Sequence, residues 1–438
     1  MGIKFIQMKY ISLNDKNHKV SFENAVVRGL APGKALYFPE KIPTLSKDFF
    51  QNLGELSEED IAFEAIKPFV GEEIDKNGLQ EILKKTLDFE FPVVPISENT
   101  GTLELFHGPT LAFKDVGAGF MAGCLGHFVK KGNLGKITVL VATSGDTGGA
   151  VANGFLGVEG IEVVILYPKG KVSEIQEKQL TTLGQNITAL EVNGNFDDCQ
   201  DMVKKAFSDA EIGEKRQLTS ANSINVARWL PQMFYYFFAY KQLTEKQEKL
   251  VFSVPSGNFG NICAGMLAKK MGLPIDHFIA SNNENNVVTR YLKSKEYIPK
   301  PSVQTISNAM DVGNPSNFVR ILELFNNEFE PLSKQLSSFS YSDEETRKAI
   351  KEVKDRYNYV MDPHGAVGYL GLQEFLAQNP DYYGTFLETA HPVKFLETVE
   401  EVIGEKVEIP ASIKEAMNKE KKSTEISDYS ELKEYLMQ

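Results

Sequence analysis

The chain has 438 residues, which is too long for one small hydrophobic core, so two or three domains are expected. Its hydrophobic content of 42% and charged content of 24% are typical of a soluble globular protein, and its net charge of −12 argues against nucleic acid as a partner. Three distant cysteines, Cys124, Cys199 and Cys263, favour neither a disulfide framework nor a CxxC metal site, and no metal is expected.

Two segments bear on membranes and targeting. Residues 1–14 lack the apolar region of a signal peptide. The longest aromatic and apolar run, residues 233–240, is far shorter than the roughly 20 residues that span a bilayer. We therefore expect a soluble, cytoplasmic protein with no membrane partner.

Residues 1–92 are expected to form a mostly helical N-terminal domain. Acidic helical periodicity covers residues 57–70, and Ser57 with Asp60 is typical of a helix start. The phrase FPVVP at residues 91–95 indicates a boundary.

Residues 93–245 are expected to form a first α/β domain. Strands and helices alternate there, and the strands are continuous Val/Ile runs, as in a parallel sheet buried on both faces. The predicted strands are 137–141, 161–167 and 187–192, and the predicted helices are 148 onward, 173–183, 197–207 and 223–243, the last kinked at Pro231.

Residues 246–438 are expected to form a second, larger α/β domain. It begins with a strand from Leu250 and a helix that ends near Gly272, and further elements are predicted at 275–280, 315–329, 343–357 and 365–377. The predicted fold is therefore α/β, with two open, mostly parallel and interleaved sheet domains and an added helical N-terminal domain.

A short glycine-rich phrase occurs twice, as SGDTGG at 144–149 and SGNFGN at 256–261. Each follows an apolar strand and opens a helix, so converging N–H groups and the positive helix end would form an anion cradle. One such loop is ordinary in α/β proteins, but two suggest a phosphate-bearing cofactor held beside a charged substrate. The second loop is the better phosphate cradle. Asp146 in the first is expected beside a substrate ammonium or a cofactor hydroxyl.

Lys114 is the candidate nucleophile. It follows Leu111, Ala112 and Phe113, and burial in that apolar setting would favour a neutral amine that can attack an aldehyde. The alternative is a surface lysine paired with Asp115.

Other candidates are more ambiguous. Asn222 is expected to cap the long helix, and Arg228 could reach a substrate phosphate with a forked contact. Thr389 could donate to a ring nitrogen or simply cap a helix, while His364 and His391 are read as turn residues. The chain has no GxSxG, HExxH or GxxxxGK[ST] motif, and no strand precedes the GxGxxA at 117–122.

Six phrases resemble, in order, those of the threonine synthase family of the pyridoxal-phosphate (PLP) fold type II superfamily: HGPTLAFKD, TSGDTGGA, NSINVARW, PSGNFGN, DPHGAVGY and ETAHPVKF. The resemblance covers nearly the whole chain. Two N-terminal phrases depart from it. Residues 11–14 replace the family's common Ser-Thr-Arg-Gly, and residues 32–34 replace Asp-Gly-Gly, which bears on domain contacts or coverage of the site.

The resemblance implies a role for each motif. Lys114 would hold PLP as a Schiff base and move protons, and Thr389 would face the pyridine nitrogen. The cofactor phosphate would lie on Gly257, Asn258, Phe259, Gly260 and Asn261. The substrate's amino-acid end would meet Ser144, Gly145, Asp146 and Thr147, and its phosphate would meet Asn222, Ser223, Asn225 and Arg228. The implied reaction is γ-elimination of phosphate from O-phospho-L-homoserine and β-addition of water, giving L-threonine.

Three alternatives remain open at this point. A serine/threonine dehydratase or phospho-lyase of the same fold would need no second anion site. A nicotinamide-dependent dehydrogenase would leave Lys114 idle and place a pyrophosphate on the twin loops. A non-catalytic ligand-binding relative would not need Lys114. The protein is expected to be a monomer or a homodimer.

Overall fold

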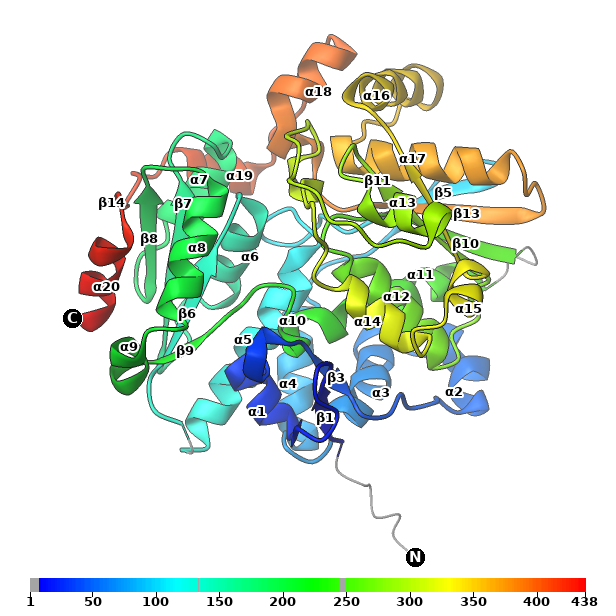
Figure 1. The fold of residues 1–438 in the computed structure, drawn as a ribbon. Helices are drawn as coiled ribbons and strands as arrows, with labels where there is room; N and C mark the ends of the chain where they lie inside the picture. The colour runs from blue at the N-terminus through cyan, green and yellow to red at the C-terminus, as the bar shows by residue number, and fades with distance from the viewer. Residues whose placement is uncertain (1–7, 133, 245–248) are drawn as a thin grey trace, which may run out of the picture.

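The computed structural model describes residues 8–132, 134–244 and 249–438 (Figure 1). Within these ranges no helix is both long and apolar enough to cross a membrane. The predicted domain boundary at 245–246 and the first seven residues of the N-terminal segment lie outside the described residues.

The smaller α/β unit has a five-stranded sheet in the order β14-β8-β7-β6-β9, and all its neighbours are parallel. Its central strand pair, β6 and β7, aligns Ile137 with Ile161, and both strands are almost wholly buried, as their continuous apolar runs predict. The strands are β6 (Ile137–Ala142), β7 (Ile161–Pro168), β8 (Ile187–Val192), β9 (Gln217–Thr219) and β14 (Thr424–Ile426). The helices around this sheet are α6 (Asp146–Gly154), α7 (Glu174–Thr181), α8 (Phe196–Ala206), α9 (Ala210–Lys215), α19 (Ala411–Met417) and α20 (Tyr429–Met437).

The larger unit has a six-stranded sheet in the order β12-β11-β10-β13-β5-β4, parallel except for the antiparallel edge strand β4. Figure 1 shows α16 and α17 on one side of it and α11 and α12 on the other. The strands are β4 (Val93–Ser97), β5 (Thr100–Glu104), β10 (Lys249–Pro255), β11 (His277–Asn282), β12 (Leu336–Ser340) and β13 (Tyr382–Glu388). The helices are α11 (Phe234–Leu243), α12 (Gly260–Lys270), α13 (Val287–Ser294), α14 (Phe318–Leu324), α15 (Phe329–Ser333), α16 (Asp343–Tyr357), α17 (Pro363–Leu376) and α18 (Leu396–Ile403).

The chain crosses between the two units more than once. Strands β4 and β5, from the predicted first domain, pair in the larger sheet, where Gly384 of β13 lies opposite Thr100. Strand β14, near the C-terminus, pairs with β8 in the smaller sheet. The two sheets are therefore assembled from interleaved segments.

The N-terminal region combines helices with a small antiparallel sheet, β2-β1-β3. The predicted helix start is confirmed, because the Ser57 hydroxyl accepts a hydrogen bond from the Asp60 amide at 3.1 Å. The three strands are too short for a recognisable alternation and were not predicted. The elements are β1 (Tyr10–Ser12), β2 (Lys19–Val20), β3 (Tyr37–Pro39), α1 (Phe22–Arg28), α2 (Lys47–Asn52), α3 (Glu58–Val70) and α4 (Lys76–Thr86).

The predicted long helix over 223–243 is broken as expected at Pro231, but its start is different. A short helix α10 (Val226–Trp229) leads into a 3-10 turn, η3 (Leu230–Met233), and then α11. The N-cap is Asn225, whose side chain accepts from the Ala227 amide, and the prediction that Asn222 caps the helix is wrong. The element predicted over 315–329, with no type assigned, is also shorter in the structure, because α14 begins at Phe318 and ends at Leu324.

Candidate active site

Lys114 is the first residue of α5 (Lys114–Lys130), between the two sheets. The segment before it is fastened to the end of β13, because the Phe113 amide donates to the Thr389 carbonyl at 2.9 Å and Ala112 pairs with Ala390. Only 18% of the Lys114 side chain is exposed. Burial lowers the pKa of Lys114, and a helix N-terminus also disfavours a positive charge. The structure thus places this lysine in the setting that the sequence predicted.

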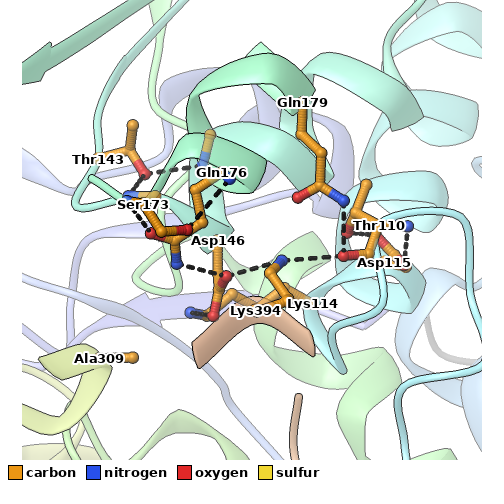
Figure 2. Close-up of polar contacts among 12 residues, drawn as sticks. Thr110, Lys114, Asp115, Thr143, Asp146, Ser173, Gln176, Gln179, Ala309 and Lys394 are labelled. Atoms are coloured by element: carbon orange, nitrogen blue, oxygen red, sulfur yellow. Dashed lines mark hydrogen bonds and ion pairs between the residues drawn. The ribbon is translucent and has the colours of Figure 1, made fainter. Parts of the chain in front are cut away.

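Asp146 begins α6 and lies between two lysines (Figure 2). Its Oδ2 is 3.7 Å from the Lys114 ammonium, and its Oδ1 is 2.7 Å from the ammonium of Lys394. Burial alone would raise the pKa of Asp146, but the two ammonium groups outweigh burial and hold the pKa well below its usual range. Asp146 is therefore a charged carboxylate beside the candidate nucleophile.

Lys394 was missed by sequence reasoning. It lies in the 3-10 turn η5 (Pro392–Phe395), and its side chain is fully buried. The signal that pointed to Lys114, a lysine between apolar neighbours, is also present in Val393-Lys394-Phe395. The partner carboxylate is 248 positions away in sequence, so the ion pair itself could not be read from local pattern.

The loop SGDTGG is held from two directions. The Thr143 hydroxyl accepts from the Gly145 and Gly148 amides, and Gln176 of α7 donates to Asp146 Oδ1 at 3.0 Å (Figure 2). Gly145 has a φ of +132°, a backbone conformation that favours glycine. Ser144 and Thr147 are half-buried beside it.

Asp115 follows Lys114 and turns away from it toward Thr110. It accepts from both the amide and the hydroxyl of Thr110, and burial raises the pKa of Asp115 to about 6. The Thr110 carbonyl in turn accepts from Gln179 at 3.1 Å and from Lys394 at 2.9 Å. Because Asp115 is bound in this way, it does not form the surface pair with Lys114 that was the alternative interpretation.

The second glycine loop has the form of an anion cradle at the start of α12. Phe259 adopts a left-handed conformation with φ +62°, which turns successive N–H groups toward one side. Within the described residues, no acceptor is found for the backbone N–H groups of residues 257–261. The side chain of Asn261 is used internally, because it donates to the Pro255 carbonyl and accepts from the Ile262 amide.

Asn258 connects this cradle to the NSINVAR phrase. Its amide nitrogen donates to the Ser223 hydroxyl at 2.7 Å, and its amide oxygen accepts from the Ser316 amide at 2.6 Å. The neighbouring Asn317 is fully buried, and its Nδ2 has no hydrogen-bond partner among the described residues. A Cβ built on Gly260 would lie 3.3 Å from that nitrogen, so the absence of a side chain at this position leaves room beside the donor.

The remaining residues predicted for substrate phosphate differ in their environment. Asn222 is half-buried, and its carbonyl accepts from the Asn225 amide. Asn225 is fully buried, and its Nδ2 donates to the Val26 and Ser220 carbonyls, so both ends of its amide are used within the fold. Arg228 is buried beside α5 and donates to the Ala221 carbonyl, while its Nε has no partner among the described residues. Burial lowers the pKa of Arg228 to about 10.

Thr389 follows β13 directly and is nearly buried. Its carbonyl accepts a hydrogen bond from the Phe113 amide. Thr389, which was predicted to face the pyridine nitrogen, therefore lies next to the segment that carries Lys114. His391 is a turn residue as predicted, because its Nδ1 accepts from the Val393 amide. His364 was also predicted to be a turn residue, but its Nδ1 lies 2.6 Å from Oδ1 of Asp362, and both side chains are buried.

These groups fit the chemistry of PLP. A phosphate needs several converging donors, and the amides of 257–261 and the Asn317 nitrogen, which have no partner in the described part of the chain, provide them. An aldehyde needs a neutral amine, which the buried Lys114 favours.

Three models of known protein families match this chain. The family model for "Pyridoxal-phosphate dependent enzyme" matches residues 102–382, and models for the threonine synthase N terminus and C-terminal region match 9–87 and 365–436. The threonine synthase of Buchnera aphidicola subsp. Baizongia pistaciae is 45% identical over 98% of this chain and 100% of that protein.

Two solved structures are similar over nearly their whole length. The threonine synthase of Escherichia coli aligns with a TM-score of 0.91 at 42% identity and covers 98% of this chain and 99% of that one. The PLP-bound threonine synthase of Brucella melitensis aligns with a TM-score of 0.92 at 34% identity, with 98% and 99% coverage.

The fold, the fit of the site and the matching family model define the class: this is a PLP-dependent enzyme of fold type II, and PLP is its cofactor. Within that class the chain belongs to the threonine synthase family, a family of lyases. The predictions of fold class, cofactor and family are confirmed. The roles of individual residues remain predictions.

Proposed function

We propose that this enzyme converts O-phospho-L-homoserine and water into L-threonine and inorganic phosphate. In the overall reaction the bond between Cγ and the phosphate oxygen breaks, and phosphate leaves with the electron pair. Water supplies the hydroxyl on Cβ. One hydrogen from Cβ and one from water end on Cγ and on phosphate, so the atoms balance.

The observation that carries this proposal is the combination of a largely buried amine and an anion cradle in a threonine synthase fold. Bound PLP supplies an electron sink for a carbanion next to the amino group. The Lys114 amine, with its pKa lowered by burial, is the group proposed to take the proton from Cα of the substrate. Residues 257–261 are proposed to hold the cofactor phosphate, with Thr389 at the ring nitrogen.

The substrate is proposed to lie between the two glycine loops. Ser144, Gly145, Asp146 and Thr147 are proposed for its amino-acid end. Ser223 is supported as a phosphate ligand because it lies against Asn258, and Arg228 because its buried Nε lacks a partner within the described chain. Asn222 remains a candidate. Asn225 has little support, because its amide is already fully hydrogen-bonded.

The attachment site is tested by reducing the coloured holoenzyme with borohydride and mapping the modified peptide. We expect the label on Lys114, and loss of colour and activity in Lys114→Ala. Lys269→Met, which removes a lysine at the far end of α12, serves as the control and should keep both. A label on another lysine would contradict the assignment.

The reaction is tested by incubating the enzyme with O-phospho-L-homoserine and measuring products. Threonine and phosphate should form in equal amounts. Ammonia and a keto acid would instead support the dehydratase alternative.

The role of Arg228 is tested with Arg228→Ala. We expect the KM for O-phospho-L-homoserine to rise by about tenfold or more, since a charge-assisted contact is worth roughly 1.5–3 kcal/mol, with little change in cofactor colour. Equal loss of substrate binding and colour would show that Arg228 serves the structure rather than the substrate.

A further inference from the structure

Lys394 is an unusual residue because its ammonium is completely buried. A buried charge is costly unless it is paired and hydrogen-bonded. Here the ammonium lies 2.7 Å from Asp146 Oδ1 and donates to the Thr110 carbonyl at 2.9 Å (Figure 2). It therefore joins the turn after β13, the start of α6 and the loop that leads to Lys114.

The Asp146 carboxylate is shared unequally between two ammonium groups. Lys394 approaches Oδ1 at 2.7 Å, whereas Lys114 approaches Oδ2 at 3.7 Å. Gln176 also donates to Oδ1, at 3.0 Å. Since Coulomb attraction and hydrogen bonding both weaken with distance, most of the negative charge is compensated by Lys394.

We propose that Lys394 is a positioning residue for Lys114: by binding the Asp146 carboxylate as a close ion pair, it prevents Asp146 from holding Lys114 as an ammonium ion and leaves that amine free to react. Two lysines share one carboxylate here, so the carboxylate can balance the positive charge of only one of them, and the proton on the other has no matching negative charge. That proton leaves from the more weakly paired amine, which is Lys114, and passes to solvent. This inference rests on the role proposed above for Lys114.

Apart from Asp146, the charged groups near Lys114 either lower its pKa or are bound to other residues. Burial lowers the pKa of Lys114, Asp146 raises it, and Lys394 and Arg228 lower it further. Asp115, on α5, is bound to Thr110. For His391, next to η5, burial lowers the pKa to about 4, so it carries no charge at neutral pH. Removing Lys394 would leave Asp146 facing Lys114 alone, and the pKa of Lys114 should then rise.

The test measures the pH dependence of Lys114 reactivity in the protein freed of cofactor, using a small amine-specific reagent and peptide mapping. In Lys394→Met the midpoint should move to higher pH by about one unit, so Lys114 is modified about tenfold more slowly below the midpoint. Lys394→Arg keeps the charge and should restore the wild-type midpoint. Lys269→Met is the control and should leave the midpoint unchanged.

A second variant makes the direction decisive. Asp146→Asn removes the carboxylate that attracts the proton, so the midpoint should move to lower pH, and the double variant Lys394→Met with Asp146→Asn should return toward wild type. The pH titration of the visible absorption of each holoenzyme gives an independent readout. Thermal unfolding of each variant identifies loss of fold, and the midpoints are compared among folded variants.

Several outcomes would overturn the inference. An unchanged or lowered midpoint in Lys394→Met, a failure of Lys394→Arg to restore it, or shifts of the same sign in Lys394→Met and Asp146→Asn would each do so. The proposed function fails separately, if borohydride labels a lysine other than position 114. The reactivity of Lys114 in the cofactor-free protein would still report on Lys394 in that case.

Discussion

At the scale of single residues, the environment of Lys114 is set by neighbours that are remote in sequence. Phe113 is held by Thr389 on one side, and the Tyr235 hydroxyl donates to the Phe113 carbonyl on the other. These two contacts fix the backbone from which the Lys114 side chain projects, at the first turn of α5. Its charge state is then decided by burial and by Asp146, whose own orientation depends on Gln176 and Lys394.

Gly145→Ala should disturb this arrangement directly. A Cβ at this position would lie 2.4 Å from the Gln176 side chain, and the φ of +132° is unfavourable for alanine. We expect unfolding to require about 1–3 kcal/mol less free energy, and the Gln176–Asp146 hydrogen bond to be lost. Urea unfolding measures the change. Gly213→Ala in α9 is the control, because nothing lies within 4 Å of its Cβ, and it should be neutral or stabilising.

At the scale of elements, helix α10 depends on one side chain. Asn225 caps it and also ties the segment to α1 through the Val26 carbonyl and to the residue after β9 through the Ser220 carbonyl. The cap therefore fixes both the start of the helix and the direction in which the Arg228 side chain projects from it.

Asn225→Ala should be more costly than the loss of an ordinary cap. Loss of the cap costs about 1 kcal/mol, and leaving the buried Ser220 carbonyl unpaired adds about 1–3 kcal/mol, whereas the Val26 carbonyl keeps a hydrogen bond from the Thr219 hydroxyl. Ser57→Ala removes an exposed cap of α3 and is the matched control, with an expected loss of about 1 kcal/mol. Equal losses in the two variants, measured by urea unfolding, would contradict the structural role of Asn225.

The elements also show what could and could not be predicted from sequence. Strand β8 was predicted with the bounds that the structure has, and the element predicted over 343–357, with no type assigned, has the bounds of helix α16. The start of α10 was misplaced because Asn222 and Asn225 are equally good caps, and only the tertiary contact with Val26 distinguishes them. The site motifs could be found from the sequence. The role of Lys394 could not, because it depends on an ion pair with the Asp146 carboxylate, which belongs to the other unit.

At the scale of the whole molecule, the C-terminal segment completes the smaller unit. Leu432 and Leu436 of α20 are fully buried in a cluster with Leu190, Met202 and Ile212. Helix α20 therefore supports a sheet in which the strands other than β14 lie more than 200 positions earlier in the chain.

Leu432→Ala should test this dependence. Deleting a fully buried leucine side chain typically costs about 2–5 kcal/mol, so the urea midpoint of the smaller unit should fall. Phe207→Ala, at a partly exposed site next to α8, should change stability by no more than about 0.5 kcal/mol. Equal stability of Leu432→Ala and wild type would show that α20 is dispensable.

The pairing of β14 with β8 has a consequence for biosynthesis. While the polypeptide is being synthesised, β8 has no partner on its outer side until residues 424–426 have also been made. An open strand edge can recruit other chains. Nascent protein is thus exposed to misassociation at this edge until β14 has been synthesised and pairs with β8.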